Sequence, residues 1–205
     1  MANPGGSVAT EMLVVRHGQT TWNAEKRWQG RADSPLSLLG IAQAQWAAKV
    51  LEPFDVVVTS DLARARDTGA IVADALRAPS FAEPDLAERD VGEWTGLSFD
   101  EIEAGWPGAL ARGDHPNGWE SDEAVADRAI GALQRIAKAH PGERVFVVTH
   151  GGLIRSLERA LGVASPYLAN LGGIWMTVDG EKVTPGERVD IIDHAAVEAT
   201  VPDSE

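Results

Sequence analysis

Short apolar segments alternate along this chain with longer segments in which apolar residues recur every three or four positions. Uninterrupted apolar runs rich in valine indicate strands covered on both faces, and they lie at 12–15, 55–60 and 144–149. The wider spacing indicates amphipathic helices at 38–51, 62–76, 97–104, 121–139 and 153–161. Alternation of this kind predicts an α/β fold, a three-layer sandwich with a mostly parallel central sheet and helices on both faces.

The last part of the chain predicts strands of a different kind. Residues 174–178 and 189–192 are apolar, and they are joined through Asp179 and Gly180, a dipeptide typical of tight turns between antiparallel strands. A short strand is also expected at 81–86. The sheet should therefore carry an antiparallel hairpin beside its parallel strands.

The remaining segments predict loops and tails. Polar residues, glycine and proline dominate 20–35 and 105–119, and with the short helix between them they predict a small cap over the carboxyl edge of the sheet. A chain of this length suits one domain with one core. We expect a single domain over 1–205 with loose tails at 1–10 and 196–205.

Two of the predicted strands end in the same way. His17 and then Gly18 come shortly after the run at 12–15, and a second strand is followed by His150 and Gly151. A lone histidine at a strand end is more often structural or solvated. The carboxyl ends of parallel strands, however, meet at one edge of a sheet, where open α/β proteins bind ligands. The repeated unit predicts that the two imidazoles meet over one site.

Composition and charge narrow the possible partners. Hydrophobic residues make up 44% and charged residues 24% of the chain, as in ordinary soluble globular proteins. The net charge of −13 argues against a nucleic-acid partner, so any anion site must be formed locally by arginines. No apolar stretch is long enough to span a bilayer, residues 1–11 do not resemble a signal peptide, and cysteine is absent. We therefore expect a cytoplasmic protein without membrane contact or disulfides.

Several groups at the predicted sheet edge suit a phosphate. Arg16 precedes the first histidine, and Arg64 and Arg66 open the second long helix. Guanidinium groups bind phosphate through two parallel hydrogen bonds, although an isolated helix arginine is usually solvated. The backbone N–H groups of Gly151 and Gly152 open another helix and form a second candidate anion site. A neutral histidine held in one tautomer completes this chemistry as a nucleophile.

A carboxylic acid is a further group that phosphoryl transfer needs when an alkoxide is the leaving group, because the departing oxygen must be protonated. The segment 86–96 contains Glu88, Asp90 and Glu93 among glycines and a tryptophan, as a loop over a site would. Spacing alone does not choose among the three acids, and at least two of them are expected to be solvated.

Five segments, in order, resemble the sequence blocks of the histidine phosphatase superfamily in its phosphoglycerate-mutase-like branch. They are LVVRHGQTTWN (13–23), QGRADSPLS followed by Gly40 and Gln43-Ala44 (29–44), SDLARARDT (60–68), L-x-E followed by G-x-W-x-G (86–96), and VTHGG (148–152). A single Arg-His-Gly would be a weak signal, whereas five ordered blocks are specific. Membership implies the α/β sandwich already predicted from the pattern.

The resemblance also implies a mechanism. His17 would attack phosphorus and form a phosphohistidine, while Arg16, Arg64 and His150 stabilise the charge on the phosphoryl group. Glu88, which occupies the place of the family's acid, would protonate the leaving oxygen and then deprotonate the hydrolytic water. Further phosphate contacts are expected from Asn23, Gln29, Gly30 and Gly151. The implied substrate is a small-molecule phosphate monoester, and the reaction needs neither a metal nor another cofactor.

Three functions fit these residues. A phosphatase and a cofactor-dependent phosphoglycerate mutase share the chemistry, but mutases of this family are typically longer between the acid and the second histidine. The short segment from Glu88 to His150 favours hydrolysis. The third function, a catalytically silent binding module, would be expected to lack part of the constellation, which is complete here.

Two positions depart from the family pattern. Thr95 stands where glutamate is common, and Trp119 stands where glycine is usual, which makes Trp119 a candidate for shaping the substrate pocket. Four other aromatics are also candidates for shaping the pocket, although isolated aromatic residues more often serve in packing: Trp22, Trp28, Trp106 and Tyr167. Three histidines lack ligand spacing and are predicted to be surface residues: His115, His140 and His194. Neither the individual substrate nor the oligomeric state follows from the sequence.

Overall fold

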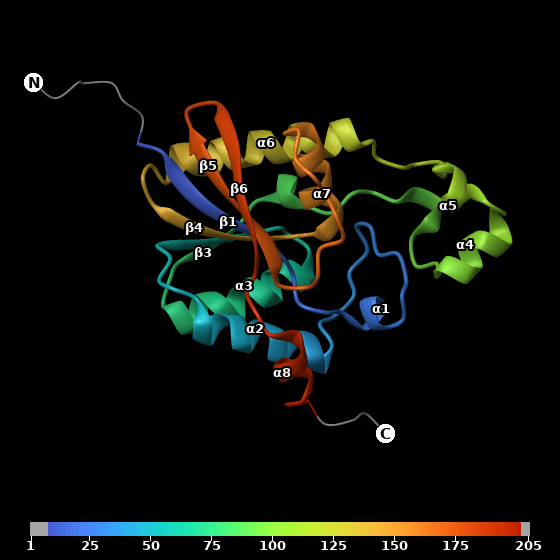
Figure 1. Cartoon of the computed structure of the whole chain (residues 1–205), viewed down its shortest axis with the longest axis horizontal. Helices are drawn as coiled ribbons and strands as arrows, with labels where there is room; N and C mark the ends of the chain where they lie inside the picture. Colours follow the sequence, from blue (N-terminus) through green and yellow to red (C-terminus); the bar gives the residue numbers. More distant parts are fainter. Residues whose placement is uncertain (1–7, 202–205) are drawn as a thin grey trace, which may run out of the picture.

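The computed structural model describes residues 8–201 and contains a six-stranded sheet (Figure 1). The strands lie in the order β3-β2-β4-β1-β5-β6. Neighbours from β3 to β1 are parallel, whereas β5 is antiparallel to both β1 and β6. The strand bounds are Thr10–Arg16 (β1), Val56–Thr59 (β2), Ser80–Ala82 (β3), Arg144–Thr149 (β4), Gly172–Asp179 (β5) and Lys182–Asp190 (β6). The expected mostly parallel sheet with a late antiparallel hairpin is confirmed.

Helices cover both faces of this sheet. α2 and α3 pack on one face and α6 and α7 on the other, which confirms the three-layer sandwich (Figure 1). The helix bounds are Thr21–Ala24 (α1), Leu38–Val50 (α2), Ala63–Leu76 (α3), Phe99–Gly105 (α4), Ala109–Arg112 (α5), Asp122–Ala139 (α6), Gly151–Ala160 (α7) and His194–Glu198 (α8), with 3-10 turns at Pro84–Leu86 (η1) and Gly92–Trp94 (η2). Within residues 8–201, no helix is long and apolar enough to cross a bilayer.

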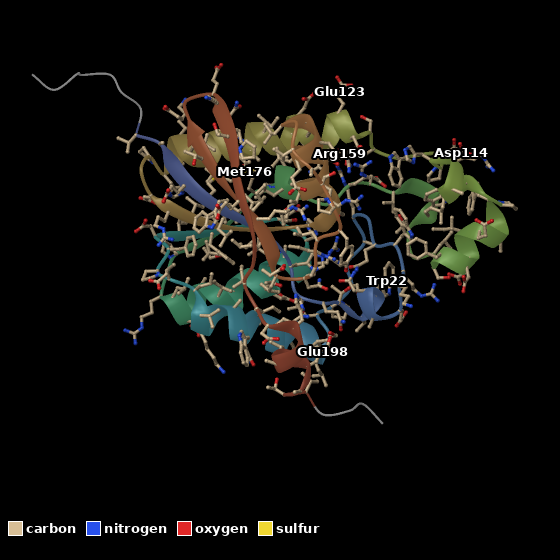
Figure 2. The ribbon with its side chains drawn as sticks, in the orientation of Figure 1. Trp22, Asp114, Glu123, Arg159, Met176 and Glu198 are labelled. Atoms are coloured by element: carbon tan, nitrogen blue, oxygen red, sulfur yellow. The ribbon has the colours of Figure 1, made fainter. Side chains whose placement is uncertain are left out.

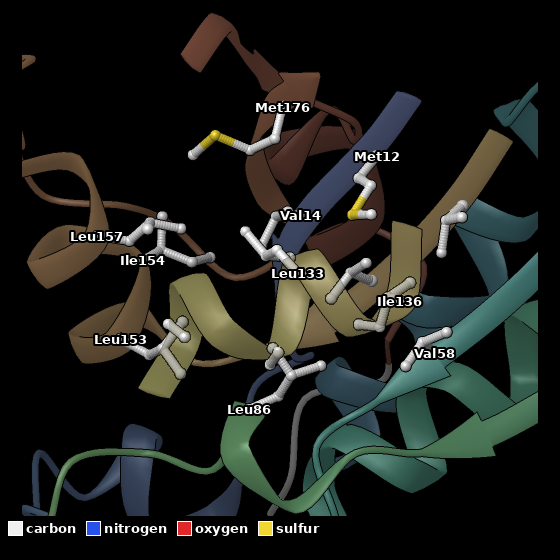
Figure 3. Packing of buried hydrophobic residues seen from close by; sticks show 14 of the residues in the cluster. Met12, Val14, Val58, Leu86, Leu133, Ile136, Leu153, Ile154, Leu157 and Met176 are labelled. Carbon is white, nitrogen blue, oxygen red and sulfur yellow. The ribbon is translucent and has the colours of Figure 1, made fainter. Parts of the chain in front are cut away.

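Side-chain alternation along β1 feeds two separate cores. Met12 and Val14 join a cluster with α6 and α7 that includes Leu133 (Figure 3). Leu13 and Val15 join the cluster on the opposite face, with α3. Successive side chains of a strand point to opposite faces, and both faces are covered here. This is why the run is apolar throughout instead of alternating with polar residues.

The cap, by which we mean residues 92–119, has a small aromatic core of its own. Trp94 and Ile102 are buried at its centre, and Trp28 from the loop after α1 packs against them. In Figure 1, α4 and α5 lie at the far right, away from the sheet. The cap expected from the sequence is therefore present, and packing between aromatic side chains holds it together.

Two expected strands have different bounds in the structure. In place of one strand over 81–86, β3 ends at Ala82 and Pro84 begins η1, because proline fixes φ near about −65° and has no N–H to donate to a strand. The second strand of the hairpin covers Lys182–Asp190 instead of 189–192. It is a half-exposed edge strand, so it lacks the apolar run that marks a buried one.

Other corrections concern loops and tails. Each of the two expected loops contains a short helix, α1 or α5. The prediction of loose tails is wrong at two points, because Thr10 is a buried residue of β1 and Val197 in α8 is buried against the end of α2. The outermost parts of both predicted tails, 1–7 and 202–205, lie outside the described residues.

Candidate active site

The pairing of β1 with β4 brings two histidines together at the carboxyl edge of the sheet. In this parallel register Arg16 lies opposite Thr149, and the backbone N–H of His17 donates to the Thr149 carbonyl at 3.0 Å. The next residue on each strand is a histidine, and the ring centroids of His17 and His150 are 5.2 Å apart. Both side chains are buried. The structure thus places the two imidazoles over one site, as the repeated sequence unit predicts.

His17 is held as a neutral imidazole with its electron pair on Nε2. Its Nδ1 lies 2.7 Å from the carbonyl oxygen of Gly18, and because a carbonyl only accepts, Nδ1 carries the proton. Nε2 accepts from Nε of Arg64 at 3.2 Å. Burial, together with the charges of Arg64 and Arg16, holds the pKa of His17 well below 6.5. These are the conditions in which an imidazole can act as a nucleophile.

His150 presents a hydrogen-bond donor beside His17. The hydroxyl of Ser60, which directly follows β2, lies 2.8 Å from Nε2 of His150. When Ser60 donates this bond, the proton of the neutral ring lies on Nδ1, which is buried and has no hydrogen-bond partner among residues 8–201. Burial and the charge of Arg64 hold the pKa of His150 well below 6.5. The sequence reasoning missed Ser60, although its place at the end of a predicted strand was a usable signal.

Arg64, in the first turn of α3, reaches across the site and supports a loop. While its Nε donates to His17, Nη1 and Nη2 donate to the carbonyl oxygens of Ala32 and Gly30 at 2.7 and 2.8 Å. The side chain is buried, which lowers its pKa, but a guanidinium stays charged at neutral pH. Arg66 is exposed, so only one of the two arginines predicted from this helix is at the site.

Arg16 brings a second guanidinium to the same cavity. Its Nη1 donates to the Leu168 carbonyl at 2.8 Å and to the Tyr167 hydroxyl at 3.2 Å. Gly151, the first residue of α7, leaves room for this side chain, because a Cβ there would lie 3.3 Å from Cδ of Arg16. Arg16, Arg64 and Gly151 all line the cavity into which His17 opens.

Among the three candidate acids, Glu88 lines the cavity and the other two do not. Its carboxylate accepts the backbone N–H groups of Gly152 and Leu153, both at 3.0 Å, and so rests on the amino end of α7. A Cβ at position 152 would lie 2.4 Å from Oε1 of Glu88, so any side chain there would displace this carboxylate. Asp90 and Glu93 instead face groups of the cap. The predicted anion site at this helix end is therefore partly filled by Glu88 itself.

The remaining predicted phosphate ligands lie along one side of the cavity, which Asn23, Gln29 and Gly30 all line. Asn23 accepts from the backbone N–H of Thr20 and closes the capping box of α1. Nε2 of Gln29 donates to the Thr20 hydroxyl at 2.8 Å, and Oε1 is buried without a partner among residues 8–201. The loop before α2 thus adds polar groups next to the histidine pair.

Comparison with known proteins identifies the family. The sequence pattern of the histidine phosphatase superfamily (branch 1) matches residues 12–172, from β1 to the start of β5. The chain belongs to the histidine phosphatase superfamily. The resemblance carried by the five sequence blocks is confirmed, and with it the expected enzyme class.

Similar members of the superfamily include phosphatases from plants and bacteria. A metal-independent phosphoserine phosphatase from Arabidopsis thaliana is 42% identical over 170 residues, covering 78% of this chain and 71% of the plant protein. A glucosyl-3-phosphoglycerate phosphatase from Mycolicibacterium vanbaalenii is 36% identical over 196 residues, 86% of this chain and 87% of its own. The structure of Bacillus stearothermophilus YhfR matches with a TM-score of 0.79 and 31% identity, over 90% of this chain and 98% of its own.

In this histidine phosphatase the site opens into a cavity of about 620 Å³ between the sheet edge, α7 and the cap. Figure 2 labels two of its lining residues, Arg159 on α7 and Asp114 in the cap, which come from distant parts of the chain. A cavity of this size suits a small phosphorylated molecule. Within the described chain, no group of three or more His, Cys, Asp or Glu side chains is arranged to hold a metal ion.

Several aromatic side chains shape the cavity in addition to packing. Trp119 lines it, as expected, and so do Trp28 and Tyr167, two of the four further candidates. Trp22 does not line it, and Trp106 lines a smaller neighbouring pocket. The cap therefore supplies one wall of the substrate site.

The prediction that three other histidines are surface residues needs correction. His115 is exposed, but it also lines the cavity, where its ring stacks on that of Trp119 with centroids 4.3 Å apart. His140 is half-buried, with Nδ1 2.9 Å from the Glu143 carboxylate, and His194 is half-buried at the start of α8. His140 is covered in part by Phe81 of β3, whose ring centroid lies 6.2 Å from its own.

Acid is expected to destabilise this fold through its two buried histidines. In the unfolded chain they titrate near 6.5, whereas in the folded protein the pKa values of His17 and His150 are held well below that value. Below pH 6.5 the unfolded state binds protons that the folded state does not, so stability falls by up to about 1.4 kcal/mol per histidine and pH unit. Urea unfolding at pH 7.5 and 5.5 should show a smaller loss for His17→Gln than for the wild type, and an unchanged loss for His115→Gln. Equal losses for His17→Gln and the wild type would contradict this origin.

Proposed function

We propose that this protein is a metal-independent phosphomonoesterase that forms a phosphohistidine on His17 and then hydrolyses it. The observation that carries the proposal is the state of His17, a buried neutral imidazole whose Nδ1 is bound to a carbonyl and whose Nε2 holds the electron pair. Around it lie two guanidinium groups, from Arg16 and Arg64, and the unpartnered Nδ1 of His150.

In the first step, Nε2 of His17 attacks phosphorus and the bond from phosphorus to the alcohol oxygen breaks. Glu88 enters this step protonated and gives its proton to the departing oxygen. The donors of Arg16, Arg64 and His150 stabilise the charge on the phosphoryl oxygens. Because packing and hydrogen bonds already hold these groups, little reorganisation is needed when the substrate reacts.

In the second step, water takes the place of the alcohol. Glu88, now a carboxylate, removes a proton from the water, whose oxygen attacks phosphorus while the bond to Nε2 breaks. The products are inorganic phosphate, the free imidazole of His17 and protonated Glu88, which returns the site to its starting state. Between the two steps, the carbonyl of Gly18 stabilises the positive charge of the phosphorylated ring through Nδ1–H.

A direct assay separates this function from the two alternatives. We expect release of phosphate from p-nitrophenyl phosphate, unchanged by a chelator, and no 2-phosphoglycerate from 3-phosphoglycerate supplied with 2,3-bisphosphoglycerate. Isomerisation in the second assay would favour the mutase. No turnover of any phosphomonoester would favour a silent binding module, and loss of activity in the chelator would contradict a metal-independent reaction.

Glu88→Gln should slow substrates with poor leaving groups far more than activated ones. Proton transfer from a positioned acid typically contributes 10²–10⁴-fold, and p-nitrophenolate leaves without it. We expect kcat/KM to fall by about 10²–10⁴-fold for alkyl phosphates and by less than about tenfold for p-nitrophenyl phosphate. kcat/KM is the quantity to compare because it reports the phosphorylation step alone when that step is irreversible.

The matched control for this variant is Glu93→Gln, which changes an acid of the same segment outside the cavity and should leave both substrates unaffected. Equal losses for alkyl and aryl phosphates in Glu88→Gln would point to another proton donor.

Two further properties stay predictions from composition. They are a cytoplasmic location and a small-molecule partner instead of a nucleic acid.

A further inference from the structure

The substrate cavity is basic although the protein is acidic. The chain has a net charge of −13, yet among the described residues six arginines and three carboxylates line the cavity. In the proposed function, Arg16 and Arg64 serve the transferred phosphate. The other four are Arg27, Arg89, Arg155 and Arg159.

Three of these four arginines are paired within the protein. Arg27 forms ion pairs with two glutamates. Arg89 and Arg159 both pair with Oδ1 of Asp122, which lies 2.9 Å from Nη2 of Arg159. The Asp122 carboxylate, at the start of α6, thus pairs with two guanidinium groups on this wall of the cavity.

Arg155 adds a third cation to this wall and has no hydrogen bond or ion pair with any residue in 8–201. It is exposed and lines the cavity. Burial lowers the pKa of Arg89, the charges of Glu88 and Glu120 raise it, and the charges of Arg159 and Arg155 lower it. Because Asp122 already pairs with Arg89 and Arg159, the Arg155 guanidinium is left at the cavity as a positive charge that a ligand anion can neutralise.

One face of α7 connects this charge to the phosphate site. Gly151, Gly152, Arg155 and Arg159 all line the cavity, and residues four positions apart on a helix lie one above the other. At about 1.5 Å per residue, the backbone of Arg155 lies about 6 Å along the axis from that of Gly151. A flexible arginine side chain at this position can reach a second anionic group on a short molecule whose phosphate lies at His17.

We propose that the alcohol part of the substrate carries a carboxylate and that Arg155, flanked by Arg159, binds it. This inference rests on the proposed hydrolysis of a phosphomonoester at His17. A planar guanidinium matches a carboxylate through two parallel hydrogen bonds, and the pair is strengthened by charge. The enzyme would then select short phosphorylated acids over neutral alcohol phosphates of the same length.

Two substrates that differ in one group test the proposal. 3-Phosphoglycerate has a carboxylate where glycerol 3-phosphate has a hydroxymethyl group, and the wild type is expected to prefer the acid. Arg155→Met removes the charge while keeping an unbranched side chain. It should lower kcat/KM for 3-phosphoglycerate by about 10- to 100-fold, mainly through KM, and change that for glycerol 3-phosphate by less than about twofold.

Arg66→Met is the matched control, because Arg66 is an exposed helix arginine outside the cavity. It removes the same charge from the protein and should leave the ratio of the two substrates unchanged. Equal losses for both substrates in Arg155→Met would assign Arg155 to the phosphate and overturn the proposal. No loss for either substrate would show a solvated side chain and overturn it as well.

Binding measurements keep this inference separate from the proposed function. Calorimetric titration of His17→Ala with the same two compounds needs no turnover. If the wild type hydrolyses no phosphomonoester, p-nitrophenyl phosphate included, but Arg155→Met in this background weakens 3-phosphoglycerate alone by tenfold or more, the carboxylate site stands and the catalytic proposal fails. If the wild type hydrolyses both and the added substitution weakens both compounds equally, the catalytic proposal stands and the carboxylate site fails.

Discussion

Replacing His17 with alanine is expected to abolish hydrolysis, lowering kcat by about 10⁵-fold or more, and to remove the covalent phosphoenzyme. His17 alone combines a neutral ring, a proton fixed on Nδ1 and an electron pair on Nε2 beside two arginines. Without this ring, water would have to attack phosphorus directly. Rapid quenching in alkali after mixing with ³²P-labelled substrate measures the intermediate, because phosphohistidine is labile in acid.

The alternative nucleophile is His150, and the same experiment distinguishes it. His115→Ala is the control, because His115 lines the cavity but lies at its exposed rim, stacked on Trp119. It should retain the labelled intermediate. Label or near-normal turnover in His17→Ala would move the nucleophile to His150, whose Nδ1 has no hydrogen-bond partner among residues 8–201.

Arg64→Met is expected to damage both catalysis and folding. A guanidinium that stabilises a transferring phosphoryl group is worth about 10³–10⁵-fold in kcat. The carbonyl oxygens of Gly30 and Ala32 would also lose their donor inside the protein. At about 1–3 kcal/mol for each of the two unpaired carbonyl groups, the free energy of unfolding should fall by about 2–6 kcal/mol. Steady-state kinetics below the unfolding transition and urea denaturation measure the two effects separately.

Arg66→Met, on the same helix and exposed, controls for loss of charge and of helix propensity. It should change kcat by less than about twofold and stability by less than about 0.5 kcal/mol. If folded Arg64→Met keeps kcat within tenfold of the wild type, the guanidinium does not stabilise the transferring group, and its role is to support the loop that contains Gly30.

The histidine pair could be predicted from the sequence because its cause is local. Two apolar runs are each followed closely by a histidine, and parallel strands end at the same edge of a sheet. In the structure, β1 and β4 are neighbours in a register that sets Arg16 opposite Thr149, so His17 and His150 come next to each other. The order of the strands itself depends on helix packing on both faces, which no local pattern specifies.

The choice of the acid needed the tertiary structure. Glu88, Asp90 and Glu93 share one short segment and similar surroundings in sequence. What separates them is the amino end of α7, whose N–H groups at Gly152 and Leu153 bind Glu88 across more than sixty positions of chain. The family resemblance pointed to Glu88, which does line the cavity, whereas spacing alone left the three acids equal.

Local sequence therefore determined the elements of this protein and its chemical type: apolar runs and helical spacing set the α/β sandwich, and strand-end histidines with arginines indicated phosphoryl transfer. Tertiary structure decided which further groups share the cavity with the two histidines. Ser60 contacts His150, Arg66 lies outside the cavity, and Arg155 and Arg159 line it. The physical reason is that hydrophobic periodicity is carried by neighbours a few residues apart. A cavity wall, in contrast, is assembled by strand order, helix rotation and cap packing between segments far apart in the chain.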